Sequence, residues 1–150
     1  MKHYIIDGNN LLHKMKELKS LQKENPQSSR EILAHKLDRF FTNKKVKVTL
    51  HFDGFAQDAI RTSKLKILYS ESKTADDEIR FQIDRTKNPK NLIIVSSDHK
   101  VLEYAKVNSS NVLKAEELII EMKKQNVKNE ESEIMKSIKN EEMKKLFGVD

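Results

Sequence analysis

Three aspartates stand at places where short apolar runs end. Asp7, Asp53 and Asp98 follow strands that the sequence predicts at residues 2–6, 46–52 and 92–95. In an open parallel sheet, ligands bind outside the carboxyl ends of the strands. We therefore expect these carboxylates to converge in space, although they lie far apart in the sequence.

Carboxylates that lie close together repel one another and are difficult to keep ionised. A hard divalent cation such as Mg²⁺ or Mn²⁺ removes this repulsion, and oxygen atoms are the ligands it prefers. Such an ion lowers the pKa of a bound water and holds phosphoryl oxygens in line, which is the chemistry of phosphodiester hydrolysis. The candidate metal ligands are the five aspartates near this edge, Asp7, Asp53, Asp76, Asp77 and Asp98.

Each candidate also has a purely structural alternative. Asp53 before Gly54 could only turn the chain, and Asp98 could cap the helix that follows it. Thr74 and Asp77 have capping-box spacing, so Asp77 could serve the start of a helix, whereas Asp76 is not needed for that box and is the preferred ligand.

Asp7 before Gly8 could likewise be a turn. The Asn9-Asn10 pair favours a functional Asp7, because a single asparagine would suffice to cap the next helix.

Helical and strand patterns alternate along most of the chain. Further strands are expected at residues 65–69 and 112–113, and helices over residues 11–18, 28–41, 74–87, 97–105 and 115–124, with a loop at 22–28. The start at residue 28 rests on a capping box formed by Ser28 and Glu31. This alternation predicts an α/β fold with a mainly parallel central sheet that helices cover on both faces.

The composition changes near Gln125, after which lysine and glutamate dominate. We expect residues 1–124 to form one domain and residues 125–150 a charged helical C-terminal extension. A length of 150 residues is that of one ordinary domain.

The formal net charge of +6 favours a polyanionic partner such as RNA, although a merely solvated basic surface would give the same charge. No cysteine is present, which excludes disulfides and thiol chemistry and fits a cytoplasmic protein. No segment approaches the roughly 20 apolar residues of a membrane span, so no membrane partner is expected.

Basic side chains flank the predicted acidic edge. They could contact substrate phosphates or could form an ordinary solvated loop. The candidates for substrate binding are Arg61, Lys64, Lys66, Lys73, Arg80 and Lys100.

Other catalytic classes lack their motifs. The sequence contains neither the glycine-rich loop of nucleotide-binding NTPases nor the dinucleotide fingerprint, and it has only 3 glycines. An aspartyl-nucleophile phosphatase would carry a second aspartate two residues after Asp7, where Asn9 stands instead.

Four motifs in this order resemble the NYN domain of the PIN-like nuclease superfamily, in particular its YacP-like group. They are Tyr-Ile-Ile-Asp-Gly-Asn-Asn at 4–10, Phe-Asp-Gly at 52–54, Thr-Ala-Asp-Asp-Glu-Ile at 74–79 and Ile-Val-Ser-Ser-Asp at 94–98. The resemblance covers roughly residues 2 to 124.

The resemblance implies a Rossmann-like three-layer α/β/α fold and a Mg²⁺- or Mn²⁺-dependent endoribonuclease, with a ribosome-associated enzyme of the A site in the same group. It implies that Asp7, Asp76 and Asp98 are catalytic, that Asn9 or Asn10 orients ligands or water, and that Ser97 supports Asp98. We expect a monomer or weak dimer. Two alternatives stay open: a non-catalytic RNA- or ribosome-binding module, and a DNA-directed nuclease.

Overall fold

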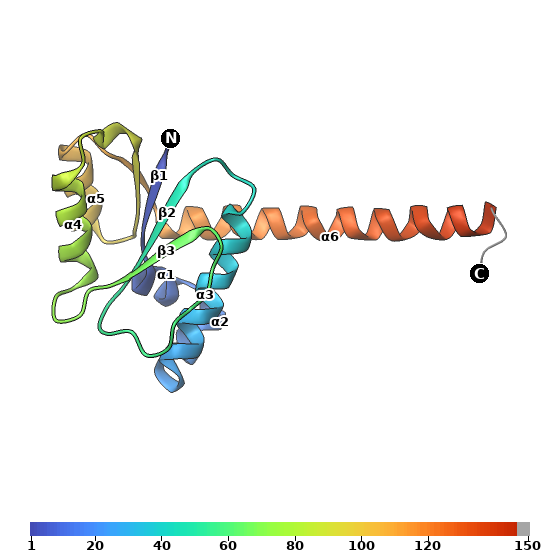
Figure 1. The fold of residues 1–150 in the computed structure, drawn as a ribbon, viewed down its shortest axis with the longest axis horizontal. Coiled ribbons are helices and arrows are strands. Elements are labelled where there is room, and N and C mark those ends of the chain that lie inside the picture. Colours follow the sequence, from blue (N-terminus) through green and yellow to red (C-terminus); the bar gives the residue numbers. More distant parts are fainter. Residues whose placement is uncertain (147–150) are drawn as a thin grey trace. The chain divides into compact units, whose positions relative to one another are not determined.

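A five-stranded parallel sheet forms the centre of the structure, a computed structural model that describes the backbone of residues 1–146 and the side chains of residues 1–142 (Figure 1). The strand order is β3-β2-β1-β4-β5. The strands are β1 (His3–Asp7), β2 (Lys47–Phe52), β3 (Leu65–Tyr69), β4 (Leu92–Val95) and β5 (Asn111–Leu113). All four pairings are parallel, so the α/β fold expected from the sequence is confirmed.

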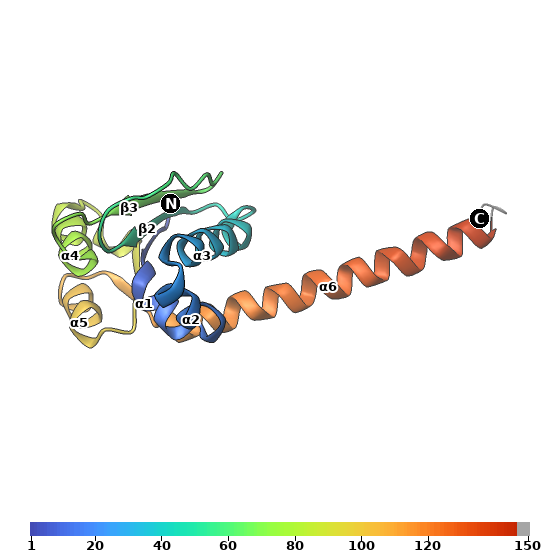
Figure 2. The same ribbon diagram turned by 90° about the horizontal axis from the view of Figure 1, so that it is seen from below.

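Helices cover both faces of this sheet, as Figure 2 shows from below. On one face, Ile5 and Ile94 pack with Ile79 of α4 (Ala75–Arg85) and Val101 of α5 (His99–Val107) in a single buried cluster. On the other, the Tyr4 ring lies 4.9 Å from the Phe41 ring of α3. The helices of that face are α1 (Gly8–Lys14), α2 (Lys16–Glu24) and α3 (Pro26–Phe41).

The first helical region differs from its prediction in two places. Met15 divides the expected single helix into α1 and α2. Residues 22–28 are mostly helical, because α3 begins at Pro26 and the Asn25 side chain accepts a 3.2 Å hydrogen bond from the Ser28 N–H. The predicted loop and the predicted cap at Ser28 were therefore wrong, since proline needs no N–H donor at the first helical position.

The connection from β2 to β3 contains no helix. Residues 53–64 run irregularly and are tied to α3 by the Asp38 carboxylate, which accepts hydrogen bonds from the Ser63 and Lys64 N–H groups. Gln27 and Arg30 of α3 also donate to backbone carbonyls of this segment. One helix thus fixes the loop that begins at Asp53.

Helix α6 (Ala115–Leu146) is continuous, so the expected end at residue 124 was wrong. Residues 125–146 contain no glycine or proline and are rich in good helix formers, which explains the continuity. The chain divides into two compact units, Met1–Leu118 and a second one that begins at Ile119. Residues 147–150 of the expected extension lie outside the described residues. No helix in the described part is long and apolar enough to cross a membrane.

Gly8 starts α1 against the end of β2, where a side chain has no room. A Cβ added there would lie 2.6 Å from the His51 carbonyl oxygen and 2.8 Å from the Phe52 ring. Contacts below 3 Å with backbone force the strand or the helix to move. The glycine therefore allows Asp7, one residue earlier, to sit close to β2.

We predict that Gly8→Ala lowers the free energy of unfolding by about 1–3 kcal/mol, the usual cost of overpacking. Chemical denaturation measures the effect, with His13→Ala at an exposed position of the same helix as the control. A Gly8→Ala variant as stable as the wild type would show that α1 does not pack on β2 as described.

Candidate active site

Asp7 lies at the carboxyl end of the central strand, in the crevice between β1 and β4. Its Oδ1 accepts a 3.3 Å hydrogen bond from the Asn10 N–H, and its Oδ2 accepts one of 3.3 Å from the Ser96 hydroxyl. The strand order places this crevice at the switch point of the sheet, where open α/β folds bind ligands. Asp7 also caps α1, so it has a structural role as well, and its functional role stays a prediction.

The pKa of the Asp7 carboxyl is raised from its ordinary 3.8 to about 6, chiefly by burial. The carboxylates of Asp53 and Asp76 contribute to this rise, and the hydrogen bonds from Asn10 and Ser96 partly offset it. The structure therefore brings together three of the five predicted ligands closely enough for their charges to repel.

Asn9 and Asn10 reach from α1 to the two neighbouring strand ends. The Asn9 Oδ1 accepts a 2.9 Å hydrogen bond from the Asp53 N–H beyond β2. The Asn10 Oδ1 accepts one of 2.7 Å from the Ser97 N–H beyond β4. The pair thus fixes the loops on both sides of Asp7, which explains why two consecutive asparagines stand there.

Asp53 is held by contacts from three elements. Its Oδ1 accepts a 2.6 Å hydrogen bond from the Ala75 N–H at the start of α4, and its carbonyl accepts one from the Arg30 guanidinium. The same guanidinium donates to the Phe55 carbonyl at 3.0 Å and lies 5.4 Å from the Phe52 ring centroid. Sequence reasoning missed Arg30, because nothing in its neighbourhood on α3 points to a loop 23 residues away.

Asp76 and Asp77 play different parts at the start of α4. Asp77 forms the predicted capping box with Thr74. The Asp76 Oδ1 accepts a 2.9 Å hydrogen bond from the Nε of Arg80, one turn along the helix. The Asp76 carboxylate contributes to the raised pKa of Asp7, and the choice of Asp76 over Asp77 as a metal ligand stays a prediction.

Asp98 caps α5, since its Oδ1 accepts a 2.9 Å hydrogen bond from the Lys100 N–H. The Asp98 N–H donates to the Ser96 hydroxyl oxygen at 3.1 Å, so one hydroxyl contacts both Asp98 and Asp7. Ser96 was missed as a site residue. The Ser97 hydroxyl, expected to support Asp98, instead bonds to the Glu116 carboxylate.

Glu116 is a further carboxylate at this edge that sequence reasoning missed. It lies in the first turn of α6, contacts Ser97, and is 3.8 Å from the Lys14 amino group. It follows β5 as Asp98 follows β4, so the rule that found the aspartates could have found it.

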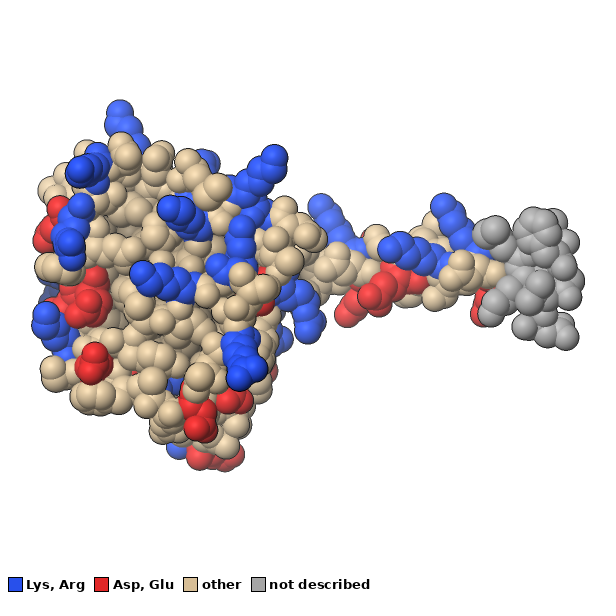
Figure 3. Space-filling view, in the orientation of Figure 1, with Lys and Arg blue, Asp and Glu red and all other residues tan. Residues whose placement is uncertain are grey.

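The predicted basic residues are spread over several elements. Arg61, Lys66 and Lys73 are exposed, whereas the Lys64 amino group donates to the Lys44 carbonyl at 2.7 Å. Arg80 pairs with Asp76 and lies over the Tyr104 ring, and Lys100 is in the first turn of α5. Figure 3 shows basic side chains scattered across the viewed face rather than gathered into one stripe.

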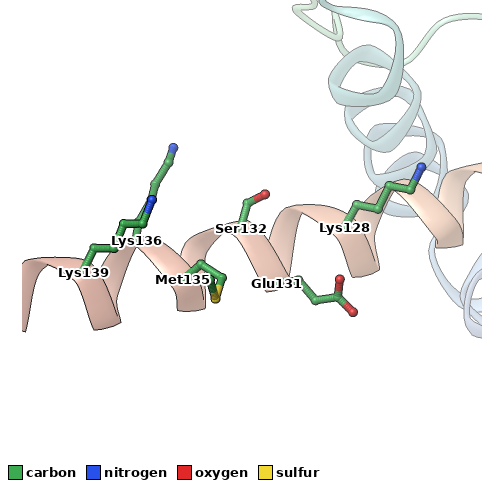
Figure 4. A pocket seen from close by; sticks show the side chains of 6 residues that line it. All are labelled: Lys128, Glu131, Ser132, Met135, Lys136 and Lys139. Atoms are coloured by element: carbon green, nitrogen blue, oxygen red, sulfur yellow. The ribbon is translucent and has the colours of Figure 1, made fainter.

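Helix α6 carries a shallow hollow lined by Lys128, Glu131, Ser132, Met135, Lys136 and Lys139 (Figure 4). All six side chains come from one helix, and only one of them is a carboxylate. The hollow is the space between neighbouring side chains of that helix and does not resemble a catalytic site.

The donor set around Asp7 fits a hard divalent cation in its chemistry. Within the described part of the chain, no three His, Asp or Glu side chains are arranged to hold a metal ion together. Magnesium commonly binds through one or two carboxylates and keeps several waters. Asp7 with Asp53 or Asp76 offers that number of carboxylates, and a cation would relieve the burial of charge and the smaller repulsion that together raise the pKa of Asp7.

We predict that Asp7→Asn stabilises the metal-free protein by about 2–3 kcal/mol at neutral pH, the free energy that corresponds to a pKa shift from 3.8 to about 6. Because the folded-state pKa is raised, the wild type is penalised when Asp7 is ionised. The advantage of the variant should be full above pH 6 and vanish below pH 4.

Denaturation across this pH range in EDTA measures the effect. Asp58→Asn, at an exposed position of the 53–64 loop, is the control, and its stability should change by less than about 0.5 kcal/mol. A destabilised Asp7→Asn variant at pH 7 would mean that the Asp7 charge is satisfied in the fold.

Comparison with known proteins agrees with this architecture. Rae1 (YacP) from Bacillus subtilis has a similar crystal structure, with a TM-score of 0.74 at 17% identity over 99% of this chain and 88% of that chain. A single-residue variant of it gives a TM-score of 0.73 at 19% identity over 92% of this chain and 86% of that chain. At this identity, the two structures support the fold alone.

No curated protein sequence matches the chain. The family model of the YacP-like NYN domain matches residues 4–147, which extends the predicted resemblance well beyond residue 124. Because that match spans nearly the whole sequence, the chain belongs to the YacP-like NYN domain family.

Proposed function

We propose that this protein is a Mg²⁺- or Mn²⁺-dependent endoribonuclease whose catalytic centre is built on Asp7. The observation that carries the proposal is the buried Asp7 carboxyl, whose pKa is raised to about 6 by burial and by the neighbouring Asp53 and Asp76. Each of the three carboxylates has a hydrogen-bond partner, but the placement of like charges near one strand end opposes folding rather than favouring it. Membership in a nuclease-like family supports RNA as the substrate.

Asp7, together with Asp53 or Asp76, would hold the cation. When bound, the cation would lower the pKa of a water molecule and neutralise phosphate oxygens. The protein's own residues keep these carboxylates in place: Asn9 fixes the Asp53 backbone, Ala75 donates to the Asp53 carboxylate, and Ser96 donates to Asp7. Such prior positioning removes the cost of ordering the groups during the reaction.

Asp98 and Asn10 border the same crevice from the β4 side. In this proposal, the Asn10 amide keeps the loop after β4 closed on Asp7, and Asp98 adds negative charge at the rim. The RNA backbone is contacted by the basic side chains of Arg61, Lys64, Lys66, Lys73, Arg80 and Lys100. Ser97 is a further residue that would contact the substrate. In this proposal, residues 1–124 are the nuclease domain and residues 125–150 are an extension. The protein is a cytoplasmic monomer or weak dimer, and its substrate is RNA bound to the ribosome.

A specific observation also favours a non-catalytic RNA-binding module. Asp76 is engaged by Arg80, and Asp98 caps α5, so both carboxylates have structural partners. Incubation of the purified protein with single-stranded RNA or DNA, in Mg²⁺, Mn²⁺ or EDTA, separates the two functions. Cleavage of RNA with either metal and none in EDTA is expected; binding of RNA without cleavage under all conditions would favour the module.

We predict that Asp7→Asn and Asp76→Asn each reduce RNA cleavage by at least about 100-fold, because both remove a charge that holds the cation. Asp77→Asn should keep most of the activity and lose about 1 kcal/mol of stability through its capping box. Initial cleavage rates and thermal midpoints are measured together. Equal loss of activity in the Asp76 and Asp77 variants would refute the assignment of Asp76.

We predict that reversing the charges of Arg61 and Lys73 weakens binding to single-stranded RNA and reduces the salt dependence of affinity by about 0.7 per lost phosphate contact. Reversal of Lys19 and Lys23, which are exposed on α2, is the matched control. Affinities are measured over a salt series in EDTA. Identical slopes for the two double variants would show that the segment before α4 is only solvated.

A further inference from the structure

A hollow of about 390 Å³ opens between α4 and the face of the sheet that α4 covers. Strands β1 to β4 contribute its floor, and α4 with its C-terminal cap residue contributes its wall. The lining residues are His3, His51, Leu68, Glu78, Phe81, Gln82, Arg85, Thr86 and Leu92. All belong to the unit Met1–Leu118.

The hollow lies on the same face of the sheet as the candidate active site, although other residues line it. His51 in its floor is the direct strand partner of Asp7, and side chains at paired positions of parallel strands point to the same face. Gln82 in its wall lies six residues after Asp76 on α4, a rise of about 9 Å. A strand of RNA whose phosphate lies at Asp7 would therefore pass the hollow within one or two nucleotides.

An aromatic side chain with a cation beside it stands at the entrance. The Phe81 side chain is 53% exposed, although large apolar side chains on a short helix are usually buried. The Arg85 guanidinium lies 5.2 Å from the Phe81 ring centroid. Exposed aromatic rings and arginine planes are the surfaces on which single-stranded bases stack.

The hollow has a mixed lining in which one pair of polar side chains is incompletely hydrogen-bonded. The His51 Nε2 bonds to the Gln82 Oε1 at 2.9 Å. The His51 Nδ1 is buried and has no partner in the described part of the chain. Folded proteins seldom leave such an atom unpaired, so His51 is an incompletely satisfied polar group beneath the floor of the hollow.

Glu78 provides a carboxylate in the same wall, half-buried on α4. A carboxylate only accepts hydrogen bonds when it is ionised. It therefore favours a base that carries an exocyclic amino group, such as cytosine, over uracil, which presents a carbonyl at that position.

Basic side chains lie near the hollow as well as in its wall. Lys47 and Lys66 both lie close enough to His3 to lower the pKa of its imidazole, after burial as the main cause. With Arg85 they give the combination typical of single-strand binding, a stacking surface beside a positively charged path.

We propose that this hollow binds one amino-bearing base of single-stranded RNA, stacked on Phe81 and contacted by Glu78, and that it sets the nucleotide preference beside the cleaved bond. The inference rests on the proposed function for its catalytic meaning. The binding itself does not depend on cleavage and can be tested separately.

Fluorescence anisotropy in EDTA, with labelled oligo(C) and oligo(U) of equal length, is the test. The wild type should bind oligo(C) about 10-fold more tightly than oligo(U). Phe81→Ala should weaken both by about 10-fold, as expected for loss of one stacked base. Glu78→Gln should remove most of the preference for oligo(C), because glutamine can also donate to uracil.

Val107→Ala, at a 77% exposed apolar position of α5, is the matched control and should bind like the wild type. Phe81→Leu tests stacking with less loss of apolar volume, and circular dichroism checks that each variant is folded. Equal affinity of the wild type for the two oligomers, or equal binding by Phe81→Ala and Val107→Ala, would overturn the proposal. If the wild type cleaves no RNA but shows the predicted binding pattern, the proposed function fails and the base-binding hollow stands.

Discussion

The structure depends on one unfavourable placement, the Asp7 carboxyl buried at the end of the central strand beside Asp53 and Asp76. Burial and like charges both oppose its ionisation, and only two hydrogen bonds partly offset them. A chain selected for stability alone would not keep this arrangement. The free energy stored there is available to bind a cation, which links the cost in stability to the proposed activity.

The contacts around Asp7, Asp53 and Asp76 keep these carboxylates from moving apart. Gly8 lets α1 start against β2, Asn9 and Asn10 hold the loops after β2 and β4, and Arg30 fixes the segment that begins at Asp53. None of these residues needs to touch the substrate. The side chains of Asn9, Asn10 and Arg30 each join elements that are distant in sequence and so limit the relative movement of those elements.

The sequence was sufficient for the sheet and for the aspartates at its edge. The strand at 65–69 and the strand at 92–95 have the predicted bounds, because continuous apolar runs between polar segments leave few other choices. The spacing of the capping box at Thr74 also distinguishes Asp77 from Asp76 without any tertiary information. These features depend on local patterns, which a sequence displays directly.

The features that escaped prediction depend on tertiary contacts. Arg30 and Ser96 act on groups that only the folded chain brings near, and nothing in their neighbours marks them. Glu116 follows the rule used for the aspartates but stands after a strand of only three residues. The start of α3 differs from its prediction because a proline among polar residues is typical of a loop, whereas Asn25 here caps a helix in which Pro26 takes the first position.

The pKa of the Asp7 side chain, measured by carbon-detected NMR with and without Mg²⁺, tests the central claim most directly. Without metal, the carboxyl should titrate near 6, as burial and the carboxylates of Asp53 and Asp76 require. Saturating Mg²⁺ should lower this pKa by more than about one unit, since the cation favours the ionised form. A pKa near the ordinary 3.8 that does not respond to Mg²⁺ would contradict the account.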